Sequence, residues 1–479
     1  MSSPSTPLPS RRLLWLVAIG FFMQTLDSTI LNTALPAMAR SLGESPLQMQ
    51  AAVVAYALTM AVMIPASGWL ADRFGTRRVF LTAMILFTLG SAACAASPSL
   101  HWLTASRVLQ GLGGALLMPV GRLAVLRAYP RERFLEAMSF VAMPGLIGPL
   151  VGPTLGGWLV EAASWHWIFL INIPVGILGA LATLRFMPAG RSDKPHAFDL
   201  SGYAMLVLAM LAISLALDGL GGLGMQHLLV LLLILLGLAS LTAYWLHALR
   251  VPAPLFAPRL FSIPSFRVGL LGNLFARIGS GAMPYLIPLL MQLAMGYSPS
   301  QAGMLMLPVA LAGMSMKRMV SPVIHRWGYR RVLIVNTTLL GLMIAGFALM
   351  TPEQPLWLRV AQMALYGAVN SMQFTAMNTV TLKDLDSAGA SAGNSMMSMV
   401  QMLGMGMGVS VAATLLSVFG QWLDIASGVV GPDTLPVFRW ALVMIGAITA
   451  MSAGIFWQLQ TDRPARDDDR RAAESRAEH

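Results

Sequence analysis

Apolar runs of about 20 residues recur from one end of the chain to the other. A helix of that length crosses the ~30 Å hydrocarbon core of a bilayer. The composition agrees, because 56% of the 479 residues are hydrophobic and only 11% are charged. In lipid, backbone N–H and C=O groups have to bond within their own segment, so these runs should be helices. The sequence therefore predicts an all-α polytopic membrane protein.

Charged or Pro/Gly-rich breaks divide the chain into fourteen predicted transmembrane helices. Their approximate limits are 13–36, 49–71, 79–97, 101–126, 138–161, 166–187, 201–218, 227–248, 266–292, 301–322, 332–351, 356–380, 391–420 and 436–458.

Basic residues indicate the orientation of these spans. They gather in loops after even-numbered spans, as at Arg73, Arg131 and Arg250, whereas loops after odd-numbered spans contain little beyond Arg40. Lys and Arg in short loops resist translocation. Both termini are therefore predicted to be cytoplasmic. The formal net charge of +11 follows from this topology, and no nucleic-acid partner is predicted.

The sequence offers little for catalysis or for a bound cofactor. Cys94 is the lone cysteine, and the seven histidines show no metal-ligand spacing. GxxxxGK[ST], GxSxG and HExxH motifs are all missing from the sequence, so neither a nucleotide loop nor a familiar catalytic group is indicated. We expect no cofactor, no metal and no enzymatic activity.

Two loops repeat one another without a gap. GWLADRFGTRRV at 68–79 aligns with SPVIHRWGYRRV at 321–332, which places Gly75 on Gly328 and Arg73 on Arg326. Each loop follows the second helix of a six-helix block, and two such halves can rock about a central site. The expected organisation is a tail at 1–12, a first bundle at 13–190, an inserted and peripheral helix pair at 198–250, a second bundle at 262–458 and a disordered cytoplasmic tail at 459–479.

Five ordered motifs resemble a known family, the major facilitator superfamily, and within it the fourteen-spanner branch of drug/proton antiporters. The motifs are LDSTILNTALP at 26–36, GWLADRFGTRR at 68–78, LTASRVLQGLGGA at 103–115, GPLVGPTLGG at 148–157 and SWHWIFLINIPVG at 164–176. The resemblance implies two six-helix halves that export small molecules by proton antiport with alternating access. One position departs from the pattern, because His325 stands in the second loop where the first has Asp72.

Two of these motifs supply candidates for conformational change. In the first loop the charges form either a latch between the halves or solvated ion pairs near Asp72; the candidates are Gly68, Asp72, Arg73, Gly75, Arg77 and Arg78. In the fifth span, glycines four residues apart allow close helix approach, which suits either a hinge or tight packing. The hinge candidates are Gly148, Pro149, Gly152, Pro153, Gly156 and Gly157, and Gly404 and Gly408 offer the same two alternatives.

Ionisable groups deep in a span are costly and are therefore functional candidates. At 1.5 Å per residue, Asp27 and Arg107 lie roughly 13 and roughly 9 Å below the outer ends of their helices, close enough in depth to pair. A carboxylate that gains and loses a guanidinium partner can bind and release a proton. Asp27 and Arg107 are thus predicted to couple proton movement to transport, the alternative being a permanent structural pair.

Polar helix faces predict a wet substrate cavity between the halves. Arg277 is placed near the membrane midplane, so drug efflux competes with export of an anionic metabolite or a metal chelate. A non-transporting sensor and an intramembrane enzyme are the other classes considered. The expected partners are a small-molecule substrate, protons and the bilayer, with a monomeric transport unit and association with other efflux components left open. The predicted cavity residues are Gln24, Ser28, Asn32, Asn273, Arg277, Asn370 and Gln373.

Overall fold

The computed structural model describes residues 11–129, 131–190, 197–221, 227–425 and 432–459. Its regular structure is helical, and 12 segments of these ranges are long and apolar enough to cross a membrane. One of them, Pro299–Leu349, is 51 residues long and contains two of the predicted spans, which meet at Gly328. A further helix, Leu356–Leu382, corresponds to the twelfth predicted span. The predicted all-α, fourteen-helix architecture is confirmed.

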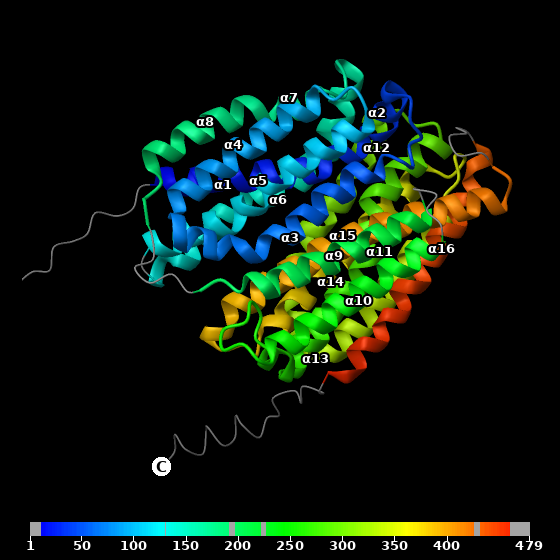
Figure 1. Ribbon diagram of the computed structural model, residues 1–479. Coiled ribbons are helices and arrows are strands. Elements are labelled where there is room, and N and C mark those ends of the chain that lie inside the picture. The colour runs from blue at the N-terminus through cyan, green and yellow to red at the C-terminus, as the bar shows by residue number, and fades with distance from the viewer. Residues whose placement is uncertain (1–10, 130, 191–196, 222–226, 426–431, 460–479) are drawn as a thin grey trace, which may run out of the picture.

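The first six-helix half forms the upper bundle in Figure 1. Ser99 begins one of its helices by accepting a hydrogen bond from the backbone N–H of Trp102, which satisfies a free donor at the helix start. The elements are α1 (Arg11–Ile30), η1 (Leu31–Thr33), α2 (Leu35–Leu42), α3 (Gln50–Phe74), α4 (Thr76–Ala95), α5 (Leu100–Ala128), α6 (Arg131–Ala162), α7 (Trp167–Leu170) and α8 (Asn172–Phe186).

The second half forms the lower bundle in Figure 1. Ser298 and Gln301 form a capping box at the start of α12, and Asp386 caps α15 by accepting from the N–H of Gly389. The elements are η2 (Pro258–Ser262), α11 (Pro264–Leu289), η3 (Leu290–Ala294), α12 (Pro299–Leu305), α13 (Leu307–Gly346), η4 (Phe347–Leu349), α14 (Leu356–Leu382), α15 (Ser387–Trp422), η5 (Pro432–Thr434), α16 (Leu435–Met451) and η6 (Ser452–Gln458).

The inserted pair consists of α9 (Leu200–Gly221) and α10 (His227–Ala248). Leucines along α10 are exposed, as expected for a peripheral helix in lipid. In contrast, α9 contacts both halves: Tyr203 Oη donates to the carbonyl of Val62 on α3 over 3.1 Å, and Ser410 Oγ of α15 donates to Asp218 over 2.6 Å. The pair is therefore attached to the transport core through α9.

The aligned glycines of the two repeated loops have the same backbone conformation. Gly75 has φ 89° and ψ 146°, and Gly328 has φ 75° and ψ 156°. Residues with a side chain rarely adopt these angles, so glycine is required at both turns. The internal repeat inferred from the sequence therefore extends to the backbone.

Glycines also set the packing within each half. A Cβ atom on Gly156 of α6 would lie 2.4 Å from the carbonyl oxygen of Ile30 on α1. In the second half, a Cβ on Gly408 of α15 would lie 2.4 Å from the carbonyl oxygen of Ile278 on α11. The two helix pairs therefore approach backbone to backbone, and both glycine stripes contribute to tight packing.

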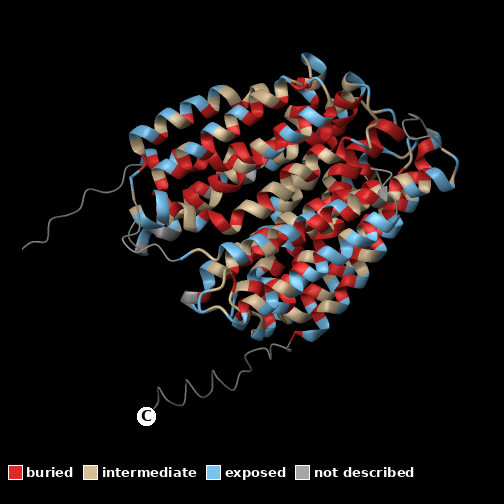
Figure 2. Cartoon of the chain, in the orientation of Figure 1, coloured by how far each residue is buried: buried red, intermediate tan, exposed pale blue. Residues whose placement is uncertain are grey.

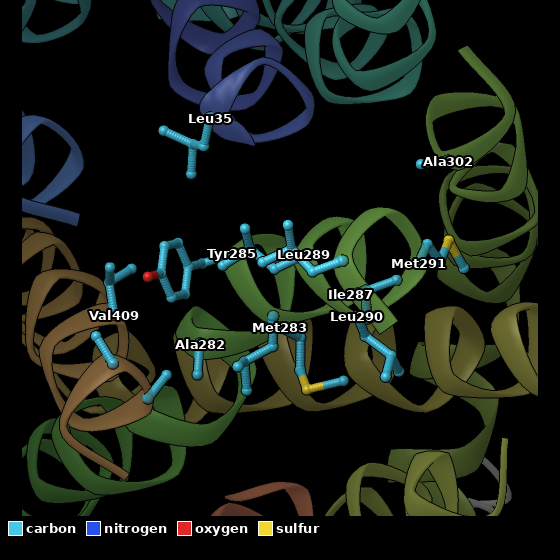
Figure 3. Packing of buried hydrophobic residues seen from close by; sticks show 14 of the residues in the cluster. Leu35, Ala282, Met283, Tyr285, Ile287, Leu289, Leu290, Met291, Ala302 and Val409 are labelled. Atoms are coloured by element: carbon cyan, nitrogen blue, oxygen red, sulfur yellow. The ribbon is translucent and has the colours of Figure 1, made fainter. Parts of the chain in front are cut away.

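The halves close against each other at the end that carries α2 and α12. A Cβ on Gly157 would lie 2.1 Å from the carbonyl oxygen of Pro299, so α6 and α12 touch through their backbones. Figure 3 shows Leu35 of the first half facing Tyr285 and Leu289 of α11. Buried residues are dense in this region (Figure 2), and Gln292 donates across it to the carbonyl of Thr33 over 3.0 Å.

A buried ion pair beside a central cavity

Asp27 and Arg107 form an ion pair inside the first half. Arg107 Nη1 of α5 lies 2.6 Å from Asp27 Oδ2 of α1, and each residue is only 1% exposed. The pairing predicted from their similar depths is confirmed. Two charges this deep are tolerated only when their remaining hydrogen-bonding atoms are also satisfied.

Gln110 forms hydrogen bonds to both members of the ion pair. Its Nε2 donates to Asp27 Oδ1 over 2.7 Å and to Ser91 Oγ over 2.7 Å, while its Oε1 accepts from Arg107 Nη1 over 2.6 Å. Asn172 Nδ2 lies 3.5 Å from Asp27 Oδ1. Gln110, Ser91 and Asn172 were not among the site residues predicted from the sequence. The available signal was the position of Gln110, one helical turn after Arg107 in a motif already singled out.

Aromatic rings enclose the guanidinium group of Arg107. Its Cζ lies 4.1 Å from the ring centre of Tyr56 and 5.9 Å from that of Phe169. The Tyr56 hydroxyl group is buried without a hydrogen-bond partner among the described residues. Cation–π contact stabilises a desolvated guanidinium, so Tyr56 shields Arg107 beside a space that both residues line.

That space is a cavity of about 150 Å³ between the halves. The first half contributes the predicted residues Gln24, Ser28 and Asn32, together with Tyr56 and Arg107. The second half contributes residues of α11 and α15 that were not predicted from the sequence. The full lining is Gln24, Thr25, Ser28, Thr29, Leu31, Asn32, Val53, Tyr56, Ala57, Met60, Arg107, Met118, Gly281, Pro284, Tyr285, Met402, Met405, Gly406 and Val409.

Four predicted cavity residues of the second half lie outside this lining. Asn273 donates to Thr381 over 3.2 Å, and Gln373 donates to Thr337 over 2.6 Å, so both amides join helices within the half. Asn370 is half-buried on α14. Their contact with substrate remains a prediction.

Arg277, the fourth of these residues, is buried on α11. Its Cζ lies 4.6 Å from the ring centre of Phe374. Its Nε and Nη2 have no hydrogen-bond partner among the described residues. It lies one helical turn before Gly281, which does line the cavity, so its free donors are close to that space without being part of its wall.

The charged loop has an ion-pair partner that was not predicted from the sequence. Asp72 was expected to lie among Arg73, Arg77 and Arg78, yet its carboxylate pairs with Arg127 at the end of α5. Arg77 donates instead to the carbonyl of Met187 over 2.6 Å. Gly68, Arg73 and Arg78 are exposed. The loop therefore joins α3, α5 and the end of α8 within the first half.

The hinge candidates of α6 all lie in one continuous helix. Gly148, Gly152 and Gly156 face α1, where a Cβ would approach Thr25, Thr29 and Ile30, respectively. Gly157 faces α12 of the other half. Pro149 is exposed, and the carbonyl of buried Pro153 accepts from Thr33 Oγ1 over 3.2 Å. The stripe thus serves packing in this state, and a hinge role remains a prediction.

Two bacterial proteins resemble this chain over nearly its whole length. A Pectobacterium carotovorum protein named "Putative multidrug resistance protein MdtD" is 52% identical over 449 residues, covering 94% of this chain and 96% of that one. An Escherichia coli protein of the same name is 49% identical over 462 residues, covering 95% and 97%. The family resemblance predicted from the five motifs thus extends over nearly the whole chain.

Two solved structures share the fold at low identity. A bacterial homolog of the human lysosomal transporter Spinster, in an inward-facing and unoccupied conformation, gives a TM-score of 0.66 at 16% identity and covers 95% of this chain and 97% of its own. A POT family transporter gives a TM-score of 0.66 at 16% identity, covering 91% and 94%. The Major Facilitator Superfamily profile matches residues 17–409. The chain is therefore a multi-pass membrane transporter, not an enzyme, and it belongs to the major facilitator superfamily.

Proposed function

We propose that this protein exports small, drug-like molecules across a bacterial inner membrane in exchange for protons. The observation that carries the proposal is the buried ion pair of Asp27 and Arg107. Arg107 lines the cavity between the halves, and the titratable carboxyl group of Asp27 lies directly behind it. The names of the relatives add multidrug resistance as the substrate class. The basic loops favour an orientation with both termini in the cytoplasm.

Proton binding at Asp27 has a physical consequence for Arg107. A neutral carboxyl group would leave the guanidinium buried without its counter-charge, which costs several kcal/mol. Relief comes from a rearrangement that lets Arg107 reach water or substrate through the cavity wall. Protonation of Asp27 thereby favours one arrangement of the halves, and release of the proton favours the other.

Alternating access then requires the closed end of the molecule to open. Two kinds of contact hold that end closed. The backbones of α6 and α12 touch, and Gln292 donates a hydrogen bond to the carbonyl of Thr33. The N–H of Ser300 also donates to Glu161 over 2.9 Å across the halves. If both termini are cytoplasmic, the closed end that carries α2 and α12 faces outward. In this proposal the structure is therefore the state in which the cavity is closed toward the outside.

Transport by purified protein in liposomes tests the proposal. Chloramphenicol should be transported when a pH gradient is imposed across the liposome membrane, in the absence of ATP. Collapse of the gradient with a protonophore should abolish net movement. Transport that requires a nucleotide, or that ignores the gradient, rejects proton antiport.

A second candidate, export of an anionic molecule, rests on Arg277. Its unpartnered Nε and Nη2 offer donors for a carboxylate, and a planar guanidinium binds carboxylates in a bidentate manner that lysine cannot reproduce. Citrate binding should then weaken in Arg277→Lys and weaken further in Arg277→Ala. Equal citrate affinity in both folded variants and in the natural protein would assign Arg277 a structural role.

A further inference from the structure

Gln24 differs from the other polar residues on its face of α1. Thr25 Oγ1 donates to the carbonyl of Phe21 over 2.8 Å, and Ser28 Oγ donates to the carbonyl of Thr25 over 2.8 Å. Their hydroxyl groups are thus satisfied by their own helix. Gln24 as a whole residue is 7% exposed. Its Oε1 is buried without a partner, and its Nε2 shows no hydrogen bond within the described residues.

An amide in this condition is costly. A buried donor or acceptor without a partner lowers the stability of the fold by about 1–3 kcal/mol relative to a hydrogen-bonded one. Most buried polar groups in proteins are therefore paired. Gln24 lines the cavity, so a molecule that enters can supply the missing partner. A group that both donates and accepts, such as an amide or a hydroxyl, suits both ends of the side chain.

The charge of the lining restricts the ligand further. Among the described residues that line the cavity, Arg107 is the one charged residue, and its charge is already matched by Asp27 behind it. An ion entering the cavity would therefore bring a charge without a counter-charge, at a desolvation cost.

The apolar part of the lining suits the body of such a ligand. Four methionines, Met60, Met118, Met402 and Met405, form much of the wall. Flexible, polarizable thioethers adapt to different apolar shapes. The wall can therefore contact apolar groups of different shapes, whereas Gln24 favours ligands that carry an amide or hydroxyl group.

We propose that Gln24 is a specificity-determining residue, and that the cavity selects uncharged amphipathic molecules that carry an amide or hydroxyl group. This inference rests on the proposed function and names its substrate class. It has a consequence for energetics: exchange of a neutral molecule for a proton moves one positive charge per cycle. Membrane potential should therefore drive transport in addition to the pH gradient.

Three variants and two probes test the inference. Chloramphenicol is uncharged and carries amide and hydroxyl groups, whereas tetraphenylphosphonium is a cation without them. Gln24→Met keeps the length of the side chain and removes the amide, and chloramphenicol affinity should fall roughly tenfold. Thr104→Ala on α5 is the control, and the affinity should change less than about twofold because the Thr104 hydroxyl lies outside the cavity lining and donates to the carbonyl of Leu100 over 2.8 Å.

Gln24→Glu should increase the affinity for a cation. A carboxylate at this position supplies the missing counter-charge, so tetraphenylphosphonium should bind more tightly than to the natural protein. Thermal unfolding in detergent verifies folding, and Gln24→Met should be at least as stable as the natural protein because an unsatisfied amide is removed.

Different results would contradict the role of Gln24, the neutral substrate class and proton-driven export. Chloramphenicol affinity that is unchanged in Gln24→Met, or a natural protein that prefers tetraphenylphosphonium, overturns the role of Gln24. Transport that responds to the pH gradient but not to a valinomycin-induced potassium potential contradicts the neutral class. If neither probe moves with a gradient in any variant, the proposed function itself fails.

Discussion

Arg107 and Asp27 are 80 residues apart in the chain, yet Nη1 of the one donates to Oδ2 of the other over 2.6 Å. Gln110 bonds to both partners, so the pair is part of a triangle of side chains. A triangle of this kind serves equally as a structural clamp or as a proton-coupling site. Substitutions that keep the shape and remove the charge distinguish the two roles.

Asp27→Asn keeps the hydrogen-bonding shape but cannot ionise. Coupling predicts a folded protein that has lost gradient-driven export, while substrate exchange without net proton movement survives. A structural pair predicts instead a loss of about 3–5 kcal/mol of stability, because Arg107 is left without its counter-charge. The measurements are thermal unfolding and proteoliposome transport.

Addition of Arg107→Gln to Asp27→Asn supplies the control. The double variant should regain stability under the structural account, because no buried charge remains. Coupled transport at the natural rate by stable Asp27→Asn would remove Asp27 from the proton pathway.

Asp72 and Arg127 are partly exposed, with side chains 32% and 27% accessible. Loss of such a pair in Asp72→Asn should change stability by less than about 1 kcal/mol. If the pair is a latch, transport should nevertheless fall severalfold, and the reversed pair Asp72→Arg with Arg127→Asp should recover it. Arg78→Gln, which removes an exposed charge from the same loop, should transport normally. Equal transport by Asp72→Asn and Arg78→Gln would leave the loop with a topological role only.

Gly156→Ala should disturb the packing of α1 against α6. The new Cβ would lie 2.4 Å from the Ile30 carbonyl oxygen, a backbone atom that cannot rotate away. Overpacking of this kind costs about 1–3 kcal/mol. Gly145→Ala on the same helix is the matched control, since its nearest contact is an ordinary 3.7 Å. A hinge predicts that transport falls more than stability does; parallel losses indicate packing alone.

Asp199 links the start of α9 to the end of α10 and the segment after it. Burial raises the pKa of this carboxyl group, but donors outweigh that effect and leave the pKa below its ordinary value; they are the backbone N–H groups of Gly202 and Leu255 and the His247 ring. A lowered pKa means that the ionised form stabilises the fold at neutral pH, and this stability is lost as pH falls through the folded-state pKa.

Asp199→Asn should therefore unfold more easily at pH 7, by about 1–2 kcal/mol. The difference from the natural protein should begin to shrink as pH falls below about 4, the ordinary pKa of an aspartate. It should vanish only below the lowered folded-state pKa, where the natural carboxyl group is protonated as well. Asp433→Asn, which alters an exposed carboxylate before α16, should have little effect at either pH. A deficit in Asp199→Asn that is constant with pH would show that ionisation is not what stabilises the hairpin.

The sequence by itself determined the helices, their order and the repeat. Lipid leaves the backbone no partner except its own helix, so apolar length is enough to define a span. The turns at Gly75 and Gly328 were equally local, because their backbone angles exclude side chains. The depth of Asp27 and Arg107 followed from helix rise alone, and depth was enough to predict that they pair.

Only the tertiary structure decided which side chains meet. Arg127, rather than a neighbour in the loop, pairs with Asp72, and Met402 and Met405 form cavity wall where Asn273 and Gln373 were expected. A helical period defines a face but not the direction in which it points. The rotation and tilt of each span are set by packing against neighbouring helices, and here backbone contacts at glycines such as Gly156 and Gly408 fix that packing.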